Sequence, residues 1–408
     1  MKYIVILGDG MADWAISELG GLTPLQKAKT PHMDFIAKNG RLGLVGTIPK
    51  GMSPGSDTAN LSVLGYDPQV YHTGRSPLEA YSIGVSLSDN DLAFRCNLVT
   101  INDDIMVDYS AGEIYTEDAA LLISDLAEAL GVELYAGTGY RHCFVLRDAE
   151  PGGVQEPPHD FTGQKFTDRM PRGKHSELLT SLTKKSWDIL KNHPVNLERI
   201  RLGKNPANSI WLWGEGKAPA LPSFYEKYAK TGAVISAVDL IKGIGLCIGF
   251  ESINVEGATG RLDTNYAGKA SAAAEALKTR DFVYLHIEAP DECSHQGHLA
   301  NKILAIEYID EKVVGPVMKE LDKREESYSI MVLPDHPTPL EIKTHTTEPV
   351  PFAFYRSDGS LSPSKAAGFD EKSAEKTGIY IEKGHLLMSE FLTWGRAHAR
   401  PVPAHPAI

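Results

Sequence analysis

The sequence predicts an α/β fold in which a doubly wound, mostly parallel sheet carries a smaller inserted α+β domain. Short runs that are apolar on both faces alternate with helical patterns, as in a parallel sheet covered by helices on both sides. Between residues 80 and 173 the runs are shorter, and Pro- and Gly-rich segments separate them. We therefore expect a core formed by residues 1–79 and 174–408 and an inserted domain formed by residues 80–173.

The individual elements follow from these patterns. Core strands are predicted, in chain order, at Tyr3–Leu7, Ile210–Trp213, Ala233–Val238, Phe282–Ile287 and Ser329–Leu333. Core helices are predicted between them at Ser176–Asn192, Ser223–Thr231 and Asn301–Glu325. The inserted domain is expected to contain one helix at Thr116–Leu130 and strands at Phe94–Ile101, Ile105–Asp108, Val132–Tyr135 and His142–Leu146.

Length and composition restrict the class of protein. The 408 residues exceed the ~250–300 at which single cores stop growing, which supports two domains. A net charge of −12 argues against nucleic acid as a partner, but not against a small phosphorylated substrate, because bound cations reverse the local field. No apolar run reaches the ~18–20 residues that span a membrane, and four dispersed cysteines suggest reduced thiols. We expect a cytoplasmic protein that contacts no membrane, and its oligomeric state stays open.

Acidic side chains follow three of the predicted core strands. Asp9 ends the first, Asp291 follows the strand at Phe282–Ile287, and Asp335 follows the last. Ligands of open α/β sheets bind at the carboxyl ends of the strands, so these three positions are expected to meet. A single Asp after a strand is more often a helix cap, and the hypothesis of a site depends on the combination.

Histidines accompany these acidic residues. His295 lies one helical turn after Asp291, His336 adjoins Asp335, and His345 lies in the polar segment KTHTTE. Mixed Asp and His sets suit Zn²⁺ or Mn²⁺ better than Ca²⁺. Two such ions ~3.5–4 Å apart would clamp the attacking and leaving oxygens of a phosphoryl transfer. The sequence therefore predicts a two-metal phosphoryl-transfer enzyme.

The segment SPGSDTANLSVLGYDP contains the candidate nucleophile, Ser56. A helix is predicted from Thr58 to Leu64, and the N-terminus of a helix favours anions such as phosphate. Because no histidine is nearby in sequence, coordination of the Ser56 oxygen to a metal is the expected means of activation. The alternatives are that Ser56 or Asp57 only caps the helix, and that Thr58 is the nucleophile.

Several longer motifs resemble a known family. The segments GDGMAD, GSDTANLSVLGYDP, HIEAPDECSHQGH and LPDHPTP with KTHTTEPVPF resemble the alkaline phosphatase superfamily. More narrowly, they are similar to the archaeal-type 2,3-bisphosphoglycerate-independent phosphoglycerate mutases. The resemblance spans nearly the whole chain and includes AFRCNLVTI, WLWGEGKAP, SAVDLIKGIG and GATGRLDTNY. It implies an alkaline-phosphatase-like core.

The resemblance also implies roles for the candidate residues. It makes Ser56 the serine that is transiently phosphorylated, and assigns two divalent metal ions, Mn, Zn, Co or Mg. Asp9, Ser56, Asp335 and His336 would hold one ion, and Asp291, His295 and His345 the other. The implied reaction is the glycolytic interconversion of 3-phosphoglycerate and 2-phosphoglycerate through phosphoserine, with the inserted domain as a cap that excludes water.

One position departs from the pattern of the family. The segment HTGRSPLEA has Ser76 where relatives usually carry glycine. Members that resemble this family also include enzymes proposed to act as homoserine kinases, and one site supports different acceptors. A related metal-dependent phosphotransferase, such as a homoserine kinase, is therefore the alternative function. A binding protein without catalysis is disfavoured by the complete set of ligand-type residues.

Cationic side chains are expected to bind the phosphate or carboxylate of the substrate. Arg141 and His142, in TGYRHCFVL, are the preferred pair, because a guanidinium binds such groups with two hydrogen bonds. The EPPHD segment supplies His159 and Asp160. Further candidates are Arg172, Lys174, Arg261 and Lys269. The alternative for each isolated Arg or Lys is a solvated surface charge.

Overall fold

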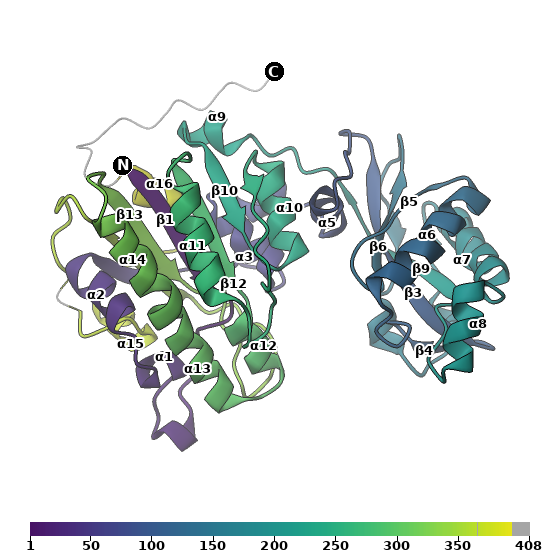
Figure 1. The fold of residues 1–408 in the computed structure, drawn as a ribbon, viewed down its shortest axis with the longest axis horizontal. Helices are drawn as coiled ribbons and strands as arrows, with labels where there is room; N and C mark the ends of the chain where they lie inside the picture. Colours follow the sequence, from purple (N-terminus) through teal and green to yellow (C-terminus); the bar gives the residue numbers. More distant parts are fainter. Residues whose placement is uncertain (365, 394–408) are drawn as a thin grey trace. The chain divides into compact units, whose positions relative to one another are not determined.

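The computed structural model describes residues 1–364 and 366–393, which form two compact units (Figure 1). The first unit contains residues 1–72 and the described residues from Pro222 onward, and the second contains residues 73–221. The second unit is thus an insertion into the first, as predicted. Among the described residues, no helix is both long and apolar enough to cross a bilayer.

An eight-stranded sheet forms the centre of the first unit. Its order is β11-β10-β12-β1-β13-β14-β2-β15, and β14 runs antiparallel to both of its neighbours while the other pairs are parallel. The bounds in this order are Glu251–Ser252, Gly232–Ile235, Phe282–Ile287, Lys2–Gly8, Tyr328–Leu333, Val350–Arg356, Arg41–Val45 and Tyr380–Ile381. The prediction of a mostly parallel sheet is confirmed, because only β14 reverses direction.

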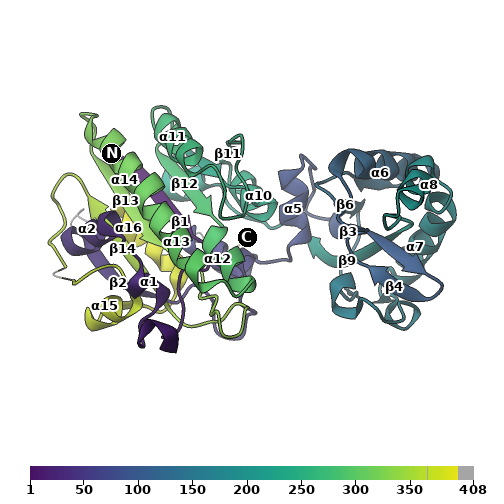
Figure 2. The same ribbon diagram turned by 60° about the horizontal axis from the view of Figure 1, so that its bottom comes forward.

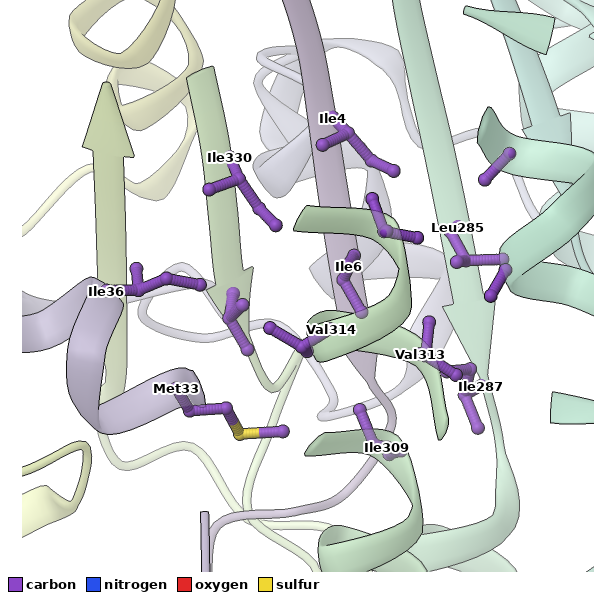
Figure 3. Close-up of a cluster of buried hydrophobic side chains, with 14 of the residues drawn as sticks. Ile4, Ile6, Met33, Ile36, Leu285, Ile287, Ile309, Val313, Val314 and Ile330 are labelled. Carbon is purple, nitrogen blue, oxygen red and sulfur yellow. The ribbon is translucent and has the colours of Figure 1, made fainter. Parts of the chain in front are cut away.

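Helices cover both faces of this sheet, so the fold is doubly wound. Figures 1 and 2 show α11, α13 and α14 over one face, and Figure 3 shows the interior of this layer, where Ile6 of β1 and Leu285 of β12 approach Val313 and Val314. The opposite face presents Tyr3, which packs on Phe391 of α16, and Tyr284, which bonds to α3. The first face is bounded by α2 (Pro31–Asn39), α11 (Tyr266–Ala276), α13 (Leu299–Ile309), the π-turn η4 (Asp310–Val314) and α14 (Gly315–Asp322).

The first unit contains further helices. α3 spans Ser56–Val63 and α12 spans Ala289–His295, and both carry candidate site residues. The others are η1 (Ser17–Leu19), α1 (Pro24–Lys27), α4 (Pro68–Tyr71), α9 (Phe224–Tyr228), α10 (Asp239–Cys247), α15 (Glu371–Lys376), η5 (Gly384–Leu386) and α16 (Leu387–Thr393).

The second unit is built on an antiparallel sheet. The strands β4, β3, β6 and β5 follow one another, and β9 also pairs with β3, over Leu92–Val99, whereas β4 pairs with the end of β3 at Thr100–Asn102. The strand bounds are β3 (Leu92–Asn102), β4 (Ile105–Asp108), β5 (Glu133–Tyr135), β6 (Arg141–Leu146) and β9 (Ser209–Lys217), with a small hairpin of β7 (Gly153–Val154) and β8 (Arg172–Gly173). The helices are α5 (Ser76–Ser82), α6 (Thr116–Leu130), η2 (Pro158–Phe161), η3 (Thr167–Arg169), α7 (Ser176–Leu190) and α8 (Pro194–Arg201).

Two predictions about this unit are corrected. The insertion runs from Thr73 to Leu221, and not from residue 80 to residue 173. Ile210–Trp213 is not a strand of the parallel core, because it belongs to β9, which pairs antiparallel with β3. The run is apolar on both faces because Leu212 packs in the cluster that contains helix α7, while Trp211 packs on Phe161. A strand covered on both sides has this pattern in either kind of sheet.

Candidate active site

Three adjacent parallel strands bring the acidic residues together. β1 lies between β12 and β13, and its Leu7 is in register with His286 on one side and Leu333 on the other. Asp9 leaves β1 just beyond this point, Asp291 lies in the helix that follows β12, and Asp335 follows β13. The predicted convergence at the carboxyl ends of the strands is therefore present.

The first half of the cluster, which we call the buried group, consists of Asp9, Asp335 and His336. His336 Nε2 lies 3.5 Å from Asp9 Oδ1 and 3.4 Å from Asp335 Oδ2, and no side chain of the three is more than 3% exposed. Backbone N–H groups of Gly10 and His336 donate to Asp335 Oδ1 at 3.1 and 2.9 Å. The backbone thus orients Asp335 and leaves its other oxygen toward the cluster.

The second half, which we call the rim group, consists of Asp291, His295 and His345. His295 Nε2 lies 3.0 Å from Asp291 Oδ2, and His345 Nε2 lies 3.5 Å from Asp291 Oδ1. The helix α12 places Asp291 and His295 one turn apart, as the spacing predicts. The two imidazoles are 35% and 22% exposed, so this group borders solvent.

Ser56 is the first residue of α3 and contacts the buried group. Its Oγ lies 3.2 Å from His336 Nε2, a partner 280 residues away that the sequence did not indicate. Gly55 takes the N-cap position with no capping side chain, so Ser56 is not the cap. Thr58, the alternative nucleophile, lies two residues further along α3 and is buried. The geometry therefore favours Ser56.

Asn60 anchors this turn of α3. Its Nδ2 donates to the carbonyl oxygen of Ser56 at 2.8 Å and to Asp335 Oδ2 at 3.0 Å, while its Oδ1 accepts from the hydroxyl of Tyr284 at 2.6 Å. Each donor and acceptor of this buried amide has a partner, which restricts its rotamer. Asn60 thereby couples the position of Ser56 to that of Asp335.

Thr338 links the two groups. Its Oγ1 donates to Asp291 Oδ1 at 2.6 Å and lies 3.2 Å from His336 Nδ1. The carbonyl oxygen of Thr338 accepts from the buried Lys302 ammonium at 2.9 Å, which also donates to Ala12 O and to Asp13 Oδ2. Lys302 therefore joins the segment after β1 to the segment after β13, and these two segments carry the buried group.

The electrostatics of the two groups differ. Burial raises the pKa of Asp9 well above its usual value, and the neighbouring Asp335 and Asp291 add to this effect. Burial also disfavours ionisation of Asp291, but hydrogen bonds from His295 and His345 outweigh it and hold the pKa of Asp291 well below its usual value. The hydrogen bond to Asp291 raises the pKa of His295 to about 9, whereas burial lowers the pKa of His336.

The donor set fits divalent cations. Asp291, His295 and His345 present ligand atoms within 4.8 Å of one another, as do Asp9, Asp291 and His336, and as do Asp9, His286 and Asp335. Among the described residues, Asp9 Oδ1 is buried and has no hydrogen-bond partner. Three carboxylates this deeply buried need compensating positive charge, and cations with mixed nitrogen and oxygen ligands would supply it.

His286 is a site residue that the sequence interpretation missed. It is fully buried near the end of β12, and its Nε2 lies 3.1 Å from Asp9 Oδ2. Burial lowers the pKa of His286 to about 4, so the imidazole is neutral at physiological pH. The signal was present in the strand FVYLHI, where one polar residue interrupts an otherwise apolar run at its carboxyl end.

Two predicted substrate contacts lie in the first unit. Lys269 is fully buried and donates to the carbonyl oxygen of His286 at 3.1 Å, so its ammonium supports β12 and is not exposed to a substrate. Burial lowers the pKa of Lys269 to about 8. Arg261 is 72% exposed and lies 3.7 Å from Asp263, as expected for a surface charge. The geometry supports neither as a substrate ligand.

Arg141 and His142 begin β6 of the second unit, but they differ in character. Arg141 is exposed, with its guanidinium 5.6 Å from the ring centroid of Tyr140. His142 is buried and accepts from the backbone N–H of Gly137, and burial lowers its pKa to about 3. Burial therefore disfavours a positive charge on His142, whereas the guanidinium of Arg141 is exposed.

The other candidates of the second unit are mainly on its surface. His159 packs edge-on against Trp213 and Tyr109, and the exposed Asp160 lies 3.6 Å from it. Arg172 is 68% exposed and pairs with Glu156 at 3.2 Å, and Lys174 is exposed. Arg95, which the sequence interpretation missed, stacks 4.2 Å from the ring centroid of Trp213 and pairs with Glu79 at 2.9 Å.

Ser76 has a structural partner. It is buried at the start of α5, and its hydroxyl donates to the carbonyl oxygen of Gly214 in β9. Both residues belong to the second unit, so this bond holds α5 on the sheet. The departure from glycine at this position is accounted for by packing.

Fold and site together define a class: a doubly wound α/β enzyme with a serine beside a carboxylate–histidine cluster suited to divalent cations. A family model described as 2,3-bisphosphoglycerate-independent phosphoglycerate mutase matches residues 37–196. A protein of that name from Methanosarcina barkeri is 55% identical over 95% of this chain and 98% of its own. The chain therefore belongs to the family of 2,3-bisphosphoglycerate-independent phosphoglycerate mutases.

Two solved structures have a similar fold. A protein from Pyrococcus horikoshii has a TM-score of 0.84 and 31% identity, covering 98% of this chain and 99% of its own. A cofactor-independent phosphoglycerate mutase from Thermoplasma acidophilum has a TM-score of 0.67 and 29% identity, covering 97% of this chain and 100% of its own. Both similarities extend over the two units.

Proposed function

We propose that this enzyme interconverts 3-phosphoglycerate and 2-phosphoglycerate through a phosphoserine formed on Ser56, as a cytoplasmic step of glycolysis. The observation that carries the proposal is the position of Ser56 Oγ, 3.2 Å from His336 Nε2 in the buried group. The name of the Methanosarcina barkeri relative supports the choice of substrate.

The proposed reaction consists of two phosphoryl transfers at one serine. In the first, a bond forms between Ser56 Oγ and phosphorus while the bond from phosphorus to the substrate oxygen breaks, which releases glycerate within the site. The glycerate then presents its other hydroxyl, which takes the phosphoryl group and restores Ser56. Ser56 is the first residue of α3, and the positive end of the helix dipole favours the phosphate at this position.

The two groups of the cluster are proposed to hold the metal ions. Asp9, Ser56, Asp335 and His336 would hold one, and Asp291, His295 and His345 the other. Two divalent cations would act as Lewis acids on the phosphoryl oxygens and favour the ionised form of the serine. Asn60 and Thr338 would hold the protein ligands in place.

The second unit is proposed to serve as the cap that binds the substrate and excludes water. Water would otherwise hydrolyse the phosphoserine and convert the mutase into a phosphatase. Arg141 is the preferred ligand for the carboxylate or phosphate, because it is exposed and its planar fork binds either group. His159 and Arg95, which both contact Trp213, are further candidates.

The direct test is an isomerisation assay without added bisphosphoglycerate. Protein loaded separately with Mn²⁺, Zn²⁺, Co²⁺ or Mg²⁺ is expected to convert 3-phosphoglycerate to 2-phosphoglycerate. Ser56→Ala should lower kcat by about 10⁴-fold or more, as removal of a covalent nucleophile does elsewhere. Thr58→Ala is the matched control and should retain activity if it folds. Absence of isomerisation with every metal would refute the proposal.

The homoserine kinase alternative was motivated by Ser76. Since the hydroxyl of Ser76 is engaged by the carbonyl oxygen of Gly214, the residue has a packing role that requires no change of acceptor. An assay with ATP and homoserine is expected to give no phosphorylated product. Product formation there, together with failure of the isomerisation assay, would replace the mutase with the kinase.

A further inference from the structure

A buried chain of hydrogen-bonding groups leads from the loop after β10 to Asp9. His286 Nε2 lies 3.1 Å from Asp9 Oδ2, and His286 Nδ1 lies 3.3 Å from Ser236 Oγ. Ser236 Oγ also accepts from the backbone N–H of Val238 at 2.9 Å. All three side chains are at least 97% buried, so water does not compete for these contacts.

The chemistry of these groups assigns the hydrogens. As a metal ligand Asp9 must be ionised, and an ionised carboxylate only accepts hydrogen bonds, so His286 Nε2 carries the hydrogen that points at Asp9. The neutral imidazole then has a lone pair on Nδ1, which accepts from the hydroxyl of Ser236. The N–H of Val238 occupies a lone pair of the Ser236 oxygen and leaves the hydroxyl hydrogen free to point at His286 Nδ1. One tautomer of His286 satisfies every contact in the chain.

We propose that His286 is a positioning residue that sets the orientation of the Asp9 carboxylate toward the metal centre. The hydrogen bond from Nε2 occupies Oδ2 and leaves Oδ1 as the oxygen that faces the centre. Oδ1 lies 3.5 Å from His336 Nε2 and, within the described residues, has no hydrogen-bond partner. This inference rests on the proposed metal centre. It adds His286, in the tautomer with hydrogen on Nε2, to the residues that support that centre.

The position of His286 suits this role. It lies on β12 directly beside β1, in register with Leu7, two residues before Asp9. Its carbonyl oxygen accepts from the buried ammonium of Lys269, which ties the strand to α11. A side chain on a central strand, bonded at both ring nitrogens, has little freedom, and partners of this kind raise the affinity of a ligand set for its metal.

A direct ligand role for His286 is the competing interpretation. Asp9, His286 and Asp335 present ligand atoms within 4.8 Å of one another. Ligation would require the lone pair of Nε2, and this atom would then have no hydrogen to donate to Asp9. A glutamine at position 286 separates the two roles, because its amide can donate as Nε2–H does but cannot replace an imidazole ligand.

The test measures binding of Mn²⁺ by calorimetry and of Co²⁺ by visible absorption, on the full chain freed of metal with a chelator. In His286→Ala, the affinity of one of two ions should fall by about 10–100-fold while the other is unchanged. Ser236→Ala should lower the affinity for the same ion by a smaller factor, because the imidazole stays in place and loses only its orienting partner. His286→Gln should retain most of the wild-type affinity and the wild-type Co²⁺ spectrum.

Several results would overturn the proposal. Unchanged affinities in His286→Ala, or equal losses for both ions, would remove the role of His286 at Asp9. Equal losses in His286→Gln and His286→Ala, with an altered Co²⁺ spectrum, would make His286 a ligand. If His286→Ala does not fold, Ser236→Ala and His286→Gln carry the test. Wild-type protein that binds two ions without isomerising phosphoglycerate would refute the proposed function and leave this inference standing.

Discussion

The buried group and the rim group use the same side-chain types in different surroundings. Asp9, Asp335 and His336 are at most 3% exposed, and Asp335 is oriented by backbone N–H groups and by Asn60. The histidines of the rim group come from the end of a short helix and from a loop, and they are 35% and 22% exposed. One group is part of the sheet core and the other is attached to its edge.

If each group holds one cation, as proposed, the difference in exposure predicts that the two cations differ in how tightly they are held. A preorganised, dry set of ligands holds a cation tightly because nothing must be ordered or desolvated on binding. The rim group instead pairs His295 with Asp291 when no ion is bound, and that pair must be broken. We expect the ion of the buried group to bind more tightly and to exchange more slowly.

The largest expected effect comes from removing one histidine of each group. In His336→Ala, loss of a buried partner costs about 3–5 kcal/mol, on the order of 10³-fold in the affinity of the buried group. In His345→Ala, the loss of affinity should be about tenfold smaller, because His345 is partly exposed and water can take the place of its imidazole at less cost. Calorimetric titration with Mn²⁺ measures both. Equal losses would show that exposure does not distinguish the groups.

The next effect concerns the ion pair that supports the buried group. Lys302 and Asp13 are 0% and 1% exposed, and their atoms are 2.8 Å apart. Lys302→Met leaves Asp13 buried without its cation and should lower the free energy of unfolding by about 3–5 kcal/mol. Lys323→Met, at a 63% exposed position, is the control and should change the free energy of unfolding by less than about 1 kcal/mol. Denaturant unfolding compares the two, and similar changes would contradict the assigned role.

The rim group should respond to pH in the range where its histidine titrates. Since the pKa of His295 is raised to about 9, the ring is protonated at neutral pH, and a metal ion must displace this proton. Affinity at the rim should therefore rise by about tenfold per unit between pH 7 and pH 9, and level off above. In the metal-free protein, the stabilisation from this histidine is complete below its ordinary pKa and is lost as pH rises through about 9.

Metal titrations at several pH values, with release of protons followed in a weakly buffered solution, check this prediction. His295→Asn is the matched variant. It should lower the metal affinity of the rim group and abolish the rise of that affinity with pH. A slope of the same size in His295→Asn would assign the proton to another group. His336 should contribute no such slope, because burial lowers its pKa.

The smallest effect tests whether the two groups are independent. Thr338 donates to Asp291 Oδ1 at 2.6 Å and lies 3.2 Å from His336 Nδ1. Thr338→Val removes both contacts and should weaken each group by about 1 kcal/mol. Thr338→Ser keeps the hydroxyl and should be close to wild type. The Mn²⁺ affinity of each group is measured by competition with a chelator. A loss of affinity at only one group would show that the Thr338 hydroxyl supports that group and not the other.

Much of the site was predictable because it follows a rule of topology. Asp9, Asp291 and Asp335 were expected to meet because parallel strands end at one edge, and they do. The choice between Ser56 and Thr58, and the division of ligands between two ions, came from the resemblance to a family. The contact of Ser56 with His336 now supports the first of these choices.

The predictions that the structure contradicts or does not support depended on surroundings that a sequence does not contain. Ile210–Trp213 has the apolar pattern of a parallel core strand, but its partners are α7 and Phe161 in the second unit. His142 has the chemistry of a cation, yet burial leaves it neutral. Lys269 was expected at the substrate and instead supports β12 from within the core.

Local patterns and general rules of sheet topology were sufficient to predict the fold class, the family and the ligand-type residues at the strand ends. The residues that orient these ligand-type side chains become apparent only in the folded chain. Asn60 meets Asp335 across 275 positions, and His286 meets Asp9 across 277. The separation into a buried and a rim group likewise depends on burial, which arises when distant segments pack and which no single segment encodes.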